Sequence, residues 1–156
     1  MSENPYAAPE SDVNVEDGKR KRPILVWVIF IFASLGLLGI LSHFAMVAGV
    51  IPLEGALGEY YASTGMLDHA LVIFGVSYGF WSALMLFKLK RSALFWFLGQ
   101  IPISIFSTLY TFSNDAWLKV MQETQQGLLV SLAPSYIYLL LVVGYVYYLY
   151  RKGTLQ

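Results

Sequence analysis

Long apolar runs separated by short polar stretches set the pattern of this 156-residue chain. There are four such runs, and they cover about residues 24–50, 68–88, 93–112 and 129–150. An α-helix rises about 1.5 Å per residue, so about 20 apolar residues cross the roughly 30 Å hydrocarbon layer of a membrane. The pattern therefore predicts an all-α fold, a four-span transmembrane helix bundle formed by residues 23–156.

The first 22 residues have the opposite character. Pro, Asn, Asp, Glu and Lys dominate MSENPYAAPESDVNVEDGKRKR, and large apolar side chains are almost absent from it. Such a segment cannot bury enough apolar surface to offset the entropy lost on ordering, so we expect residues 1–22 to form a disordered tail. The apolar run that follows is longer than the 7–15 residues of a signal-peptide core, and we expect it to be retained.

Charged residues make up only 13% of the chain, and the two signs are separated along it. Basic residues flank the first run, the turn between the second and third runs, and the end of the fourth: Lys19, Arg20, Lys21, Arg22, Lys88, Lys90, Arg91, Arg151 and Lys152. The two longer loops instead carry mainly acidic residues: Glu54, Glu59, Asp68, Asp115 and Glu123. Because basic loops are retained in the cytoplasm, we expect both termini to be cytoplasmic and the two longer loops to face the opposite compartment.

One of these loops has the signal of a short surface helix. Ser113 and Asn114 are good N-cap residues, and the segment 115–125 carries Trp117, Leu118 and Met121 at spacings that suit a membrane surface. We expect a helix over residues 115–125.

The third run carries a line of polar residues that is unusual for a membrane span. Within LGQIPISIFSTLYTFS, residues 98–113, five uncharged polar side chains share one helix face: Gln100, Ser104, Ser107, Thr108 and Thr111. A polar group that faces lipid is costly, so this face should point into the bundle. Two interpretations stay open: a path for a polar solute, or hydroxyls that bond to neighbouring helices and hold the bundle together.

Pro102 interrupts the same span. Proline has no N–H, so it frees the carbonyl one turn earlier, near Leu98, and its ring kinks the helix. A polar neighbour or a water molecule can satisfy that carbonyl. We therefore expect a helix kink at Pro102, which favours a packing role for the polar face.

The second run contains a small-xxx-small pair, Gly75 and Gly79, within FGVSYGF. Such a pair lets two helix backbones approach closely and predicts helix packing at these glycines. The contact is either with another span of the same chain or with a second copy in a homo-oligomer.

Two histidines and an aspartate near the ends of the first two runs, His43, Asp68 and His69, are the candidate metal ligands. No HxxxH or HExxH spacing places them on one helix face, and Asp68 is well placed to stabilise a helix N-terminus. We therefore expect no metal site. If a metal ion did bind, these three residues would be its ligands.

Several functional classes lack their residues in this chain. It has no cysteine, which excludes disulfides and thiolate chemistry. The middle of each predicted span is free of Asp, Glu, Lys and Arg, the residues that mark proton relays and ion coupling. Phosphate-binding loops are absent from the sequence, and the GxSxG match at residues 75–79, GVSYG, lies inside a predicted span rather than at the strand-to-helix turn that forms a nucleophile elbow. We expect no enzyme, no cofactor and no nucleic-acid partner.

The opening NPYAAPES resembles the NPYxxP tail that begins many small bacterial inner-membrane proteins of unassigned function. The matching residues are Asn4, Pro5, Tyr6 and Pro9. The resemblance implies a bacterial cytoplasmic membrane, which would make the longer loops periplasmic.

The leading functional hypothesis is a non-enzymatic membrane protein that acts by association with other membrane components, as a subunit or modulator of a larger system. The bilayer is its first partner, and a membrane-protein partner or a second copy is its second. The alternative is a small oligomeric transporter or channel that uses the polar face of the third span.

Overall fold

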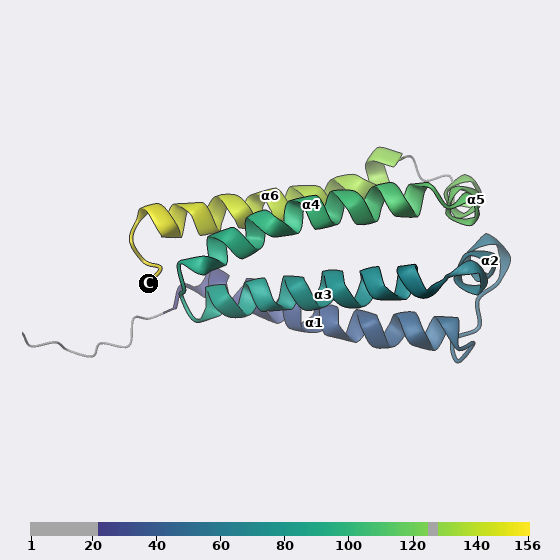
Figure 1. Cartoon of the computed structure of the whole chain (residues 1–156), viewed down its shortest axis with the longest axis horizontal. Coiled ribbons are helices and arrows are strands. Elements are labelled where there is room, and N and C mark those ends of the chain that lie inside the picture. Colours follow the sequence, from purple (N-terminus) through teal and green to yellow (C-terminus); the bar gives the residue numbers. More distant parts are fainter. Residues whose placement is uncertain (1–21, 125–127) are drawn as a thin grey trace, which may run out of the picture.

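The computed structural model describes residues 22–124 and 128–156, and residues 1–21 and 125–127 lie outside this description. The described residues form six helices and no strand: α1 (Ile24–Val47), α2 (Gly55–Ser63), α3 (Met66–Phe87), α4 (Ser92–Phe112), α5 (Asp115–Glu123) and α6 (Leu128–Arg151). Four helices are long and apolar enough to cross a membrane: α1, α3, α4 and the part of α6 that starts at Leu132. The prediction of an all-α chain with four candidate spans is confirmed (Figure 1).

The surface of these helices is that of a membrane protein. Large apolar side chains face outward along all four long helices; Ile24, Leu41, Phe95 and Leu141, for example, are each more than 60% exposed. So large an exposed apolar surface has a suitable surrounding in hydrocarbon and none in water.

The helices α1, α3 and α6 each end in the same kind of hydrogen-bonded turn, and this turn sets the residue at which the helix stops. At the end of α1 the Val50 amide donates to the Ala45 carbonyl and the Gly49 amide to the Met46 carbonyl. Gly49 has φ +70°, a conformation that glycine adopts without steric cost. The helix therefore ends at Val47 rather than near residue 50 as expected.

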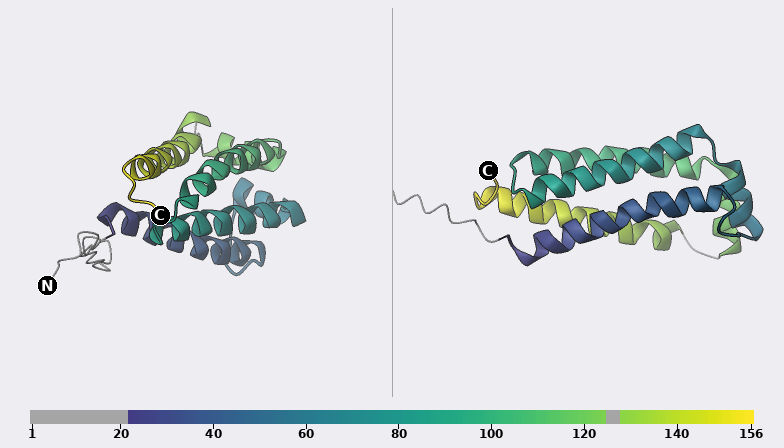
Figure 2. Two further views of the ribbon diagram at one scale, coloured as in Figure 1. Left: turned by 60° about the vertical axis from the view of Figure 1, so that its left-hand side comes forward. Right: turned by 90° about the horizontal axis from the view of Figure 1, so that it is seen from below.

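The long helices form an arc rather than a closed ring. α3 packs against α1 on one side and α4 on the other, and α4 packs against α6. α1 and α6 are the two outer walls of this arc, and their backbones are not packed together to any comparable extent. The short helices α2 and α5 pack against each other and lie across one end of the bundle (Figures 1 and 2).

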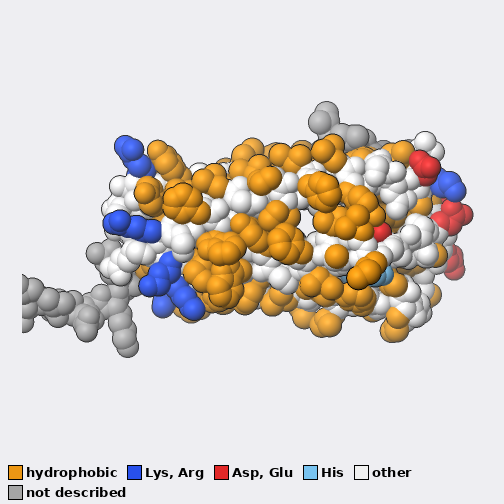
Figure 3. All heavy atoms as spheres, in the orientation of Figure 1, with side chains coloured by type: hydrophobic (Ala, Val, Ile, Leu, Met, Phe, Trp, Pro, Cys, Tyr) orange, Lys and Arg blue, Asp and Glu red, His pale blue; other side chains and the backbone are white. Residues whose placement is uncertain are grey.

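The two ends of the bundle have opposite charge (Figure 3). We name them by that charge. The basic end holds the side chains Arg22, Lys88, Lys90, Arg91, Arg151 and Lys152. The acidic end is the end crossed by α2 and α5, and it holds Glu54, Glu59, Asp115 and Glu123 together with Lys119.

The hydrophobic core lies at the basic end, where all four long helices contribute buried side chains. Its members are Val26, Ile29, Ala83, Leu86, Leu89, Ala93, Leu94, Phe97, Val142, Val146, Leu149 and Leu155. The segment after α6 completes it: Leu155 is 1% exposed, and Gln156 exchanges backbone hydrogen bonds of 2.7 Å with Leu89 and Arg91 in the α3–α4 turn. Leu89 has φ +55°, a strained conformation that this packing holds in place.

The described chain begins one residue before the predicted boundary between tail and spans. Arg22, predicted to end the tail, donates from Nε to the Phe87 carbonyl at 2.8 Å and lies 4.5 Å from the centre of the Phe87 ring. The rest of the predicted disordered tail, residues 1–21, lies outside the described residues, as does the NPYxxP segment.

Candidate functional site

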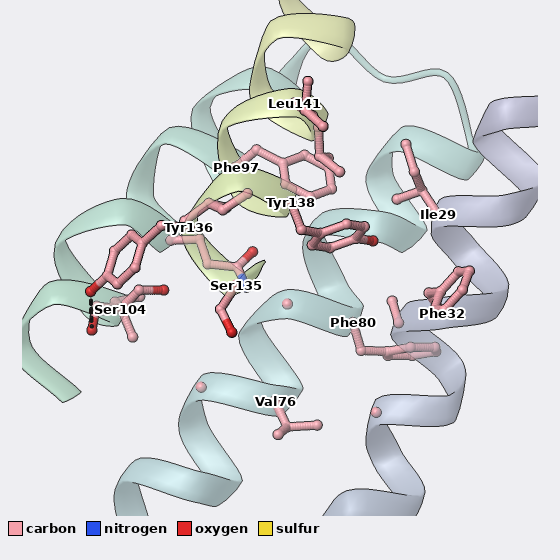
Figure 4. A pocket seen from close by; sticks show the side chains of 18 of the residues that line it. Ile29, Phe32, Val76, Phe80, Phe97, Ser104, Ser135, Tyr136, Tyr138 and Leu141 are labelled. Atoms are coloured by element: carbon pink, nitrogen blue, oxygen red, sulfur yellow. Dashed lines mark hydrogen bonds between the residues drawn. The ribbon is translucent and has the colours of Figure 1, made fainter. Parts of the chain in front are cut away.

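Beyond the core, the four long helices surround an open groove of about 1260 Å³ (Figure 4). α3 and α4 form its floor, and α1 and α6 form its sides. The lining residues fall within 25–36 of α1, 71–80 of α3, 97–108 of α4 and 132–145 of α6. Most are apolar, and none of the described residues that line it carries a charge.

Two rings reach across the groove from its opposite sides. Tyr138 of α6 extends towards Ile29 and Phe32 of α1 (Figure 4), and the Phe32 and Tyr138 ring centres are 6.5 Å apart. The two sides of the groove therefore touch at this pair of rings.

The polar face of the third span is turned inward. Gln100, Ser104, Ser107 and Thr108 line the groove. Thr111 lines a second cavity of about 170 Å³ nearer the acidic end, together with Ser107, Thr108, Phe112, Trp117 and Leu132. Because three residues line both cavities, the polar face runs without interruption from the groove towards α5.

Part of this face is used in packing. The Tyr136 hydroxyl of α6 donates to Thr108 Oγ1 (2.9 Å) and to the Ser104 carbonyl oxygen (3.2 Å), which ties α6 to α4. Thr111 donates to the Ser107 carbonyl four residues earlier. Tyr136 could not be assigned this role from the sequence, because nothing in its local pattern shows that it faces α4.

The two glycines of α3 have different surroundings. A Cβ atom built on Gly79 would lie 3.0 Å from Gln100 Nε2, so this position lets the Gln100 side chain approach the α3 backbone. A Cβ atom built on Gly75 would have no atom within 4 Å, because Gly75 opens onto the groove. The role of this pair in helix packing stays a prediction.

Two prolines lie inside the spans. Pro102 is exposed, and α4 continues through it from Ser92 to Phe112. The kink predicted at Pro102 stays a prediction. Pro134 of α6, which the sequence analysis did not discuss, lines the groove.

The three candidate metal ligands lie near the acidic end but do not form one set. His43 Nε2 of α1 and His69 Nδ1 of α3 are 3.0 Å apart, a hydrogen bond between two imidazoles. The Asp68 carboxylate instead accepts from the Gly65 amide (2.8 Å), which caps α3, and from the Tyr110 hydroxyl (3.4 Å). Within residues 22–124 and 128–156, no three His, Asp or Glu side chains are grouped to hold a metal ion.

The helices of the acidic end are joined by polar contacts. Asn114 caps α5 by accepting from the Ala116 amide, so the predicted helix is present and runs from Asp115 to Glu123. Glu123 in turn accepts from the Ala56 amide at the start of α2 (3.0 Å). Tyr60 of α2 is partly buried here, and burial, followed by the negative charge of Asp68, raises the pKa of Tyr60 to about 12.

Comparisons with protein families, with curated proteins and with solved structures find no match to this chain.

Proposed function

We propose that this chain is a multi-pass protein of a bacterial cytoplasmic membrane, with its basic end and both termini in the cytoplasm. The support is the separation of charge: six of the described basic side chains lie at the basic end, and the acidic end holds four carboxylates and one lysine. Basic residues beside spans are retained on the cytoplasmic side, whereas acidic residues have little influence on orientation. The NPYxxP tail supports the bacterial assignment.

Its function in this proposal is non-enzymatic: it holds another membrane-embedded molecule in the groove, as a subunit or modulator of a membrane system. The observation that carries this is the open side of the bundle. α1 and α6 meet in the core at the basic end, yet between them the spans leave about 1260 Å³ unfilled. The groove is open to the bilayer and cannot stay empty within hydrocarbon, and we infer that a specific guest, rather than bulk lipid alone, fills it.

A photoreactive amino acid tests this in the native membrane. We would place it at Val76, which lines the groove, and as a control at Ile73, which is 43% exposed on α3 outside the groove. If a guest occupies the groove, the probe at Val76 should form one recurrent adduct, identified by its mass, and the probe at Ile73 should not. The same spread of bulk lipid adducts at both positions would contradict the proposal.

A second candidate function is the transport of a polar solute by an oligomer. It is favoured by one observation: the polar face continues from the groove into the cavity at the acidic end. Single cysteines at Ser104, Ser107 and Thr111, introduced into this cysteine-free chain, test it with a membrane-impermeant thiol reagent. Ser82→Cys, at a fully buried position, is the unreactive control. Reaction along the whole face supports a path, and protection along the whole face excludes one.

A further inference from the structure

We propose that the guest of the groove is an uncharged lipid of the diacylglycerol type: hydrocarbon chains joined to a glycerol that carries ester carbonyls and a hydroxyl. This rests on the proposed function and names the chemical class of the molecule bound. Three features of the groove support this assignment: the ring contact across it, its lack of charge and the free hydrogen-bonding groups of its polar side chains.

The width excludes a helix at the narrow part. Phe32 and Tyr138 bring the two sides of the groove to 6.5 Å between ring centres. At that distance the two rings touch, so neither a helix, about 10 Å across, nor a hydrocarbon chain passes between them. A flexible chain can lie along the floor of the groove beneath the rings, whereas a rigid helix cannot bend around them, and this favours a flexible chain over a partner span.

The lack of charge excludes an ordinary phospholipid head group inside the groove. Of the described lining residues, none is Asp, Glu, Lys or Arg. An ionised phosphate at this depth would be without a counter-charge, which is costly in a medium of low polarity. A neutral head group has no such cost and can enter more deeply.

Several serines of the spans are satisfied by their own helix, whereas two that line the groove are not. Outside the groove, Ser34, Ser42 and Ser82 each donate to the backbone carbonyl four residues earlier, at 2.8 to 3.2 Å. Among the described contacts the side-chain hydroxyls of the groove-lining Ser104 and Ser135 make no hydrogen bond. The exposed Ser77 of α3, outside the groove, is likewise unbonded among the described contacts, so Ser104 and Ser135 are distinguished by their place: their free hydroxyls are within reach of a guest in the groove.

Gln100 also lines the groove with hydrogen-bonding groups that have no partner. Its amide lies against Gly79 and, within the described part of the chain, makes no hydrogen bond. Gln100 comes eight residues after the start of α4, about 12 Å along the helix, and so lies well inside a hydrocarbon layer of roughly 30 Å. The Gln100 side chain thus has two N–H donors and one carbonyl acceptor without partners in hydrocarbon. A guest with hydrogen-bonding groups would satisfy them.

Ester carbonyls and a hydroxyl match this set. The carbonyl oxygens accept from the Gln100 amide and from the serine hydroxyls, and the glycerol hydroxyl donates to the Gln100 carbonyl oxygen. The acyl chains lie along the apolar walls. Such a guest satisfies the polar groups of the groove without bringing in a charge.

The test uses purified protein in phosphatidylcholine vesicles that contain a diacylglycerol with a photoreactive acyl chain. We expect labelling of peptides from α4 and α6, competed by unlabelled dioleoylglycerol and not by dioleoylphosphatidylglycerol. Gly75→Leu should reduce labelling about tenfold, because the leucine fills open groove space. Gly39→Leu is the matched control, since its Cβ also meets no atom within 4 Å but Gly39 does not line the groove.

Two further variants keep the test decisive if Gly75→Leu folds poorly. Ser135→Leu narrows the groove from the α6 side and should also reduce labelling. Gln100→Leu should weaken competition by dioleoylglycerol about five- to tenfold, the effect of one hydrogen bond in low-polarity surroundings. Gln122→Leu, on α5 outside the groove, should have no effect.

The outcomes separate this inference from the proposed function. Equal competition by the phosphatidylglycerol, or a protein adduct from the Val76 probe, overturns the diacylglycerol assignment and leaves a guest in the groove. Equal labelling of wild type, Gly75→Leu and Ser135→Leu, together with no distinct adduct from Val76, overturns both.

Discussion

The His43–His69 pair shows how one contact between two side chains links two spans near the acidic end. In each imidazole the neutral form has one donor and one acceptor nitrogen, so the 3.0 Å contact requires one ring to donate and the other to accept. His43 is only 8% exposed and His69 is partly buried, so a residue at position 43 that cannot replace this bond leaves the His69 ring nitrogen without its partner. The pair therefore stabilises the α1–α3 contact.

Replacing His43 tests that role. His43→Ala should lower the free energy of unfolding by about 1–3 kcal/mol, from the lost hydrogen bond and the lost packing. Thermal unfolding in detergent measures it. Ser42→Ala is the neighbouring control: Ser42 is exposed and bonds only to its own helix, so its loss should cost under about 0.5 kcal/mol. Equal losses in the two variants would contradict a specific role for the pair.

Tyr60 gives the chain a distinct response to alkaline pH. Its pKa of about 12 in the folded chain lies above the ordinary value of 10.0, so the folded state holds the phenol proton more tightly than the unfolded state. The stability from this difference is fully present below pH 10 and is lost as the pH rises towards 12. In Tyr60→Phe, unfolding temperatures should fall less steeply between about pH 10 and 12 than in wild type. Tyr147→Phe, at an exposed position of α6, should follow wild type.

At the scale of elements, α2 and α5 form a pair that closes the acidic end. Glu123 of α5 accepts from the Ala56 amide in the first turn of α2, where the helix leaves its N–H groups unpaired. Lys119 and Glu59 add an ion pair of 3.0 Å between side chains that are both more than 60% exposed. Both contacts join α2 to α5, but we expect the Glu123–Ala56 hydrogen bond to contribute more to stability than the exposed Lys119–Glu59 ion pair.

Matched substitutions measure that difference. Glu123→Ala should destabilise α2 by about 1 kcal/mol, the usual cost of losing an N-terminal cap, and should speed hydrogen exchange at the first amides of α2. Glu59→Ala should change exchange little, because an exposed ion pair contributes about 0–1 kcal/mol. A larger change in hydrogen exchange in Glu59→Ala than in Glu123→Ala would contradict this expectation.

The elements also show how far the sequence alone reaches. The four spans and α5 could be predicted because apolar runs and an Asn cap are local signals. The nine-residue helix α2 was not assigned, because GALGEYYAS contains two glycines and lacks a clear cap. The inward direction of the polar face followed from helical periodicity. The groove and the histidine contact did not, because they depend on which helices pack together and in which register.

At the scale of the whole molecule, the orientation in the membrane is the most direct prediction. Ser92 and Ser113 stand just at the two ends of α4, and both are exposed. In intact cells, Ser113→Cys should react with a membrane-impermeant thiol reagent, and Ser92→Cys should react only after permeabilisation. The same substitution at both ends controls for reactivity. The reverse pattern would place the basic end outside the cytoplasm.

The contact of Leu155 with the α3–α4 turn has a consequence for biogenesis. Leu155 follows all four spans, and its carbonyl accepts from Arg91, 64 positions earlier in the chain. A ribosome that adds about 5–20 residues per second needs roughly 3–13 s to cover that interval. During this time the turn has been synthesised, but the residues whose packing holds Leu89 in its strained conformation have not. A nascent chain interrupted before Leu155 thus carries its spans around an incompletely filled core.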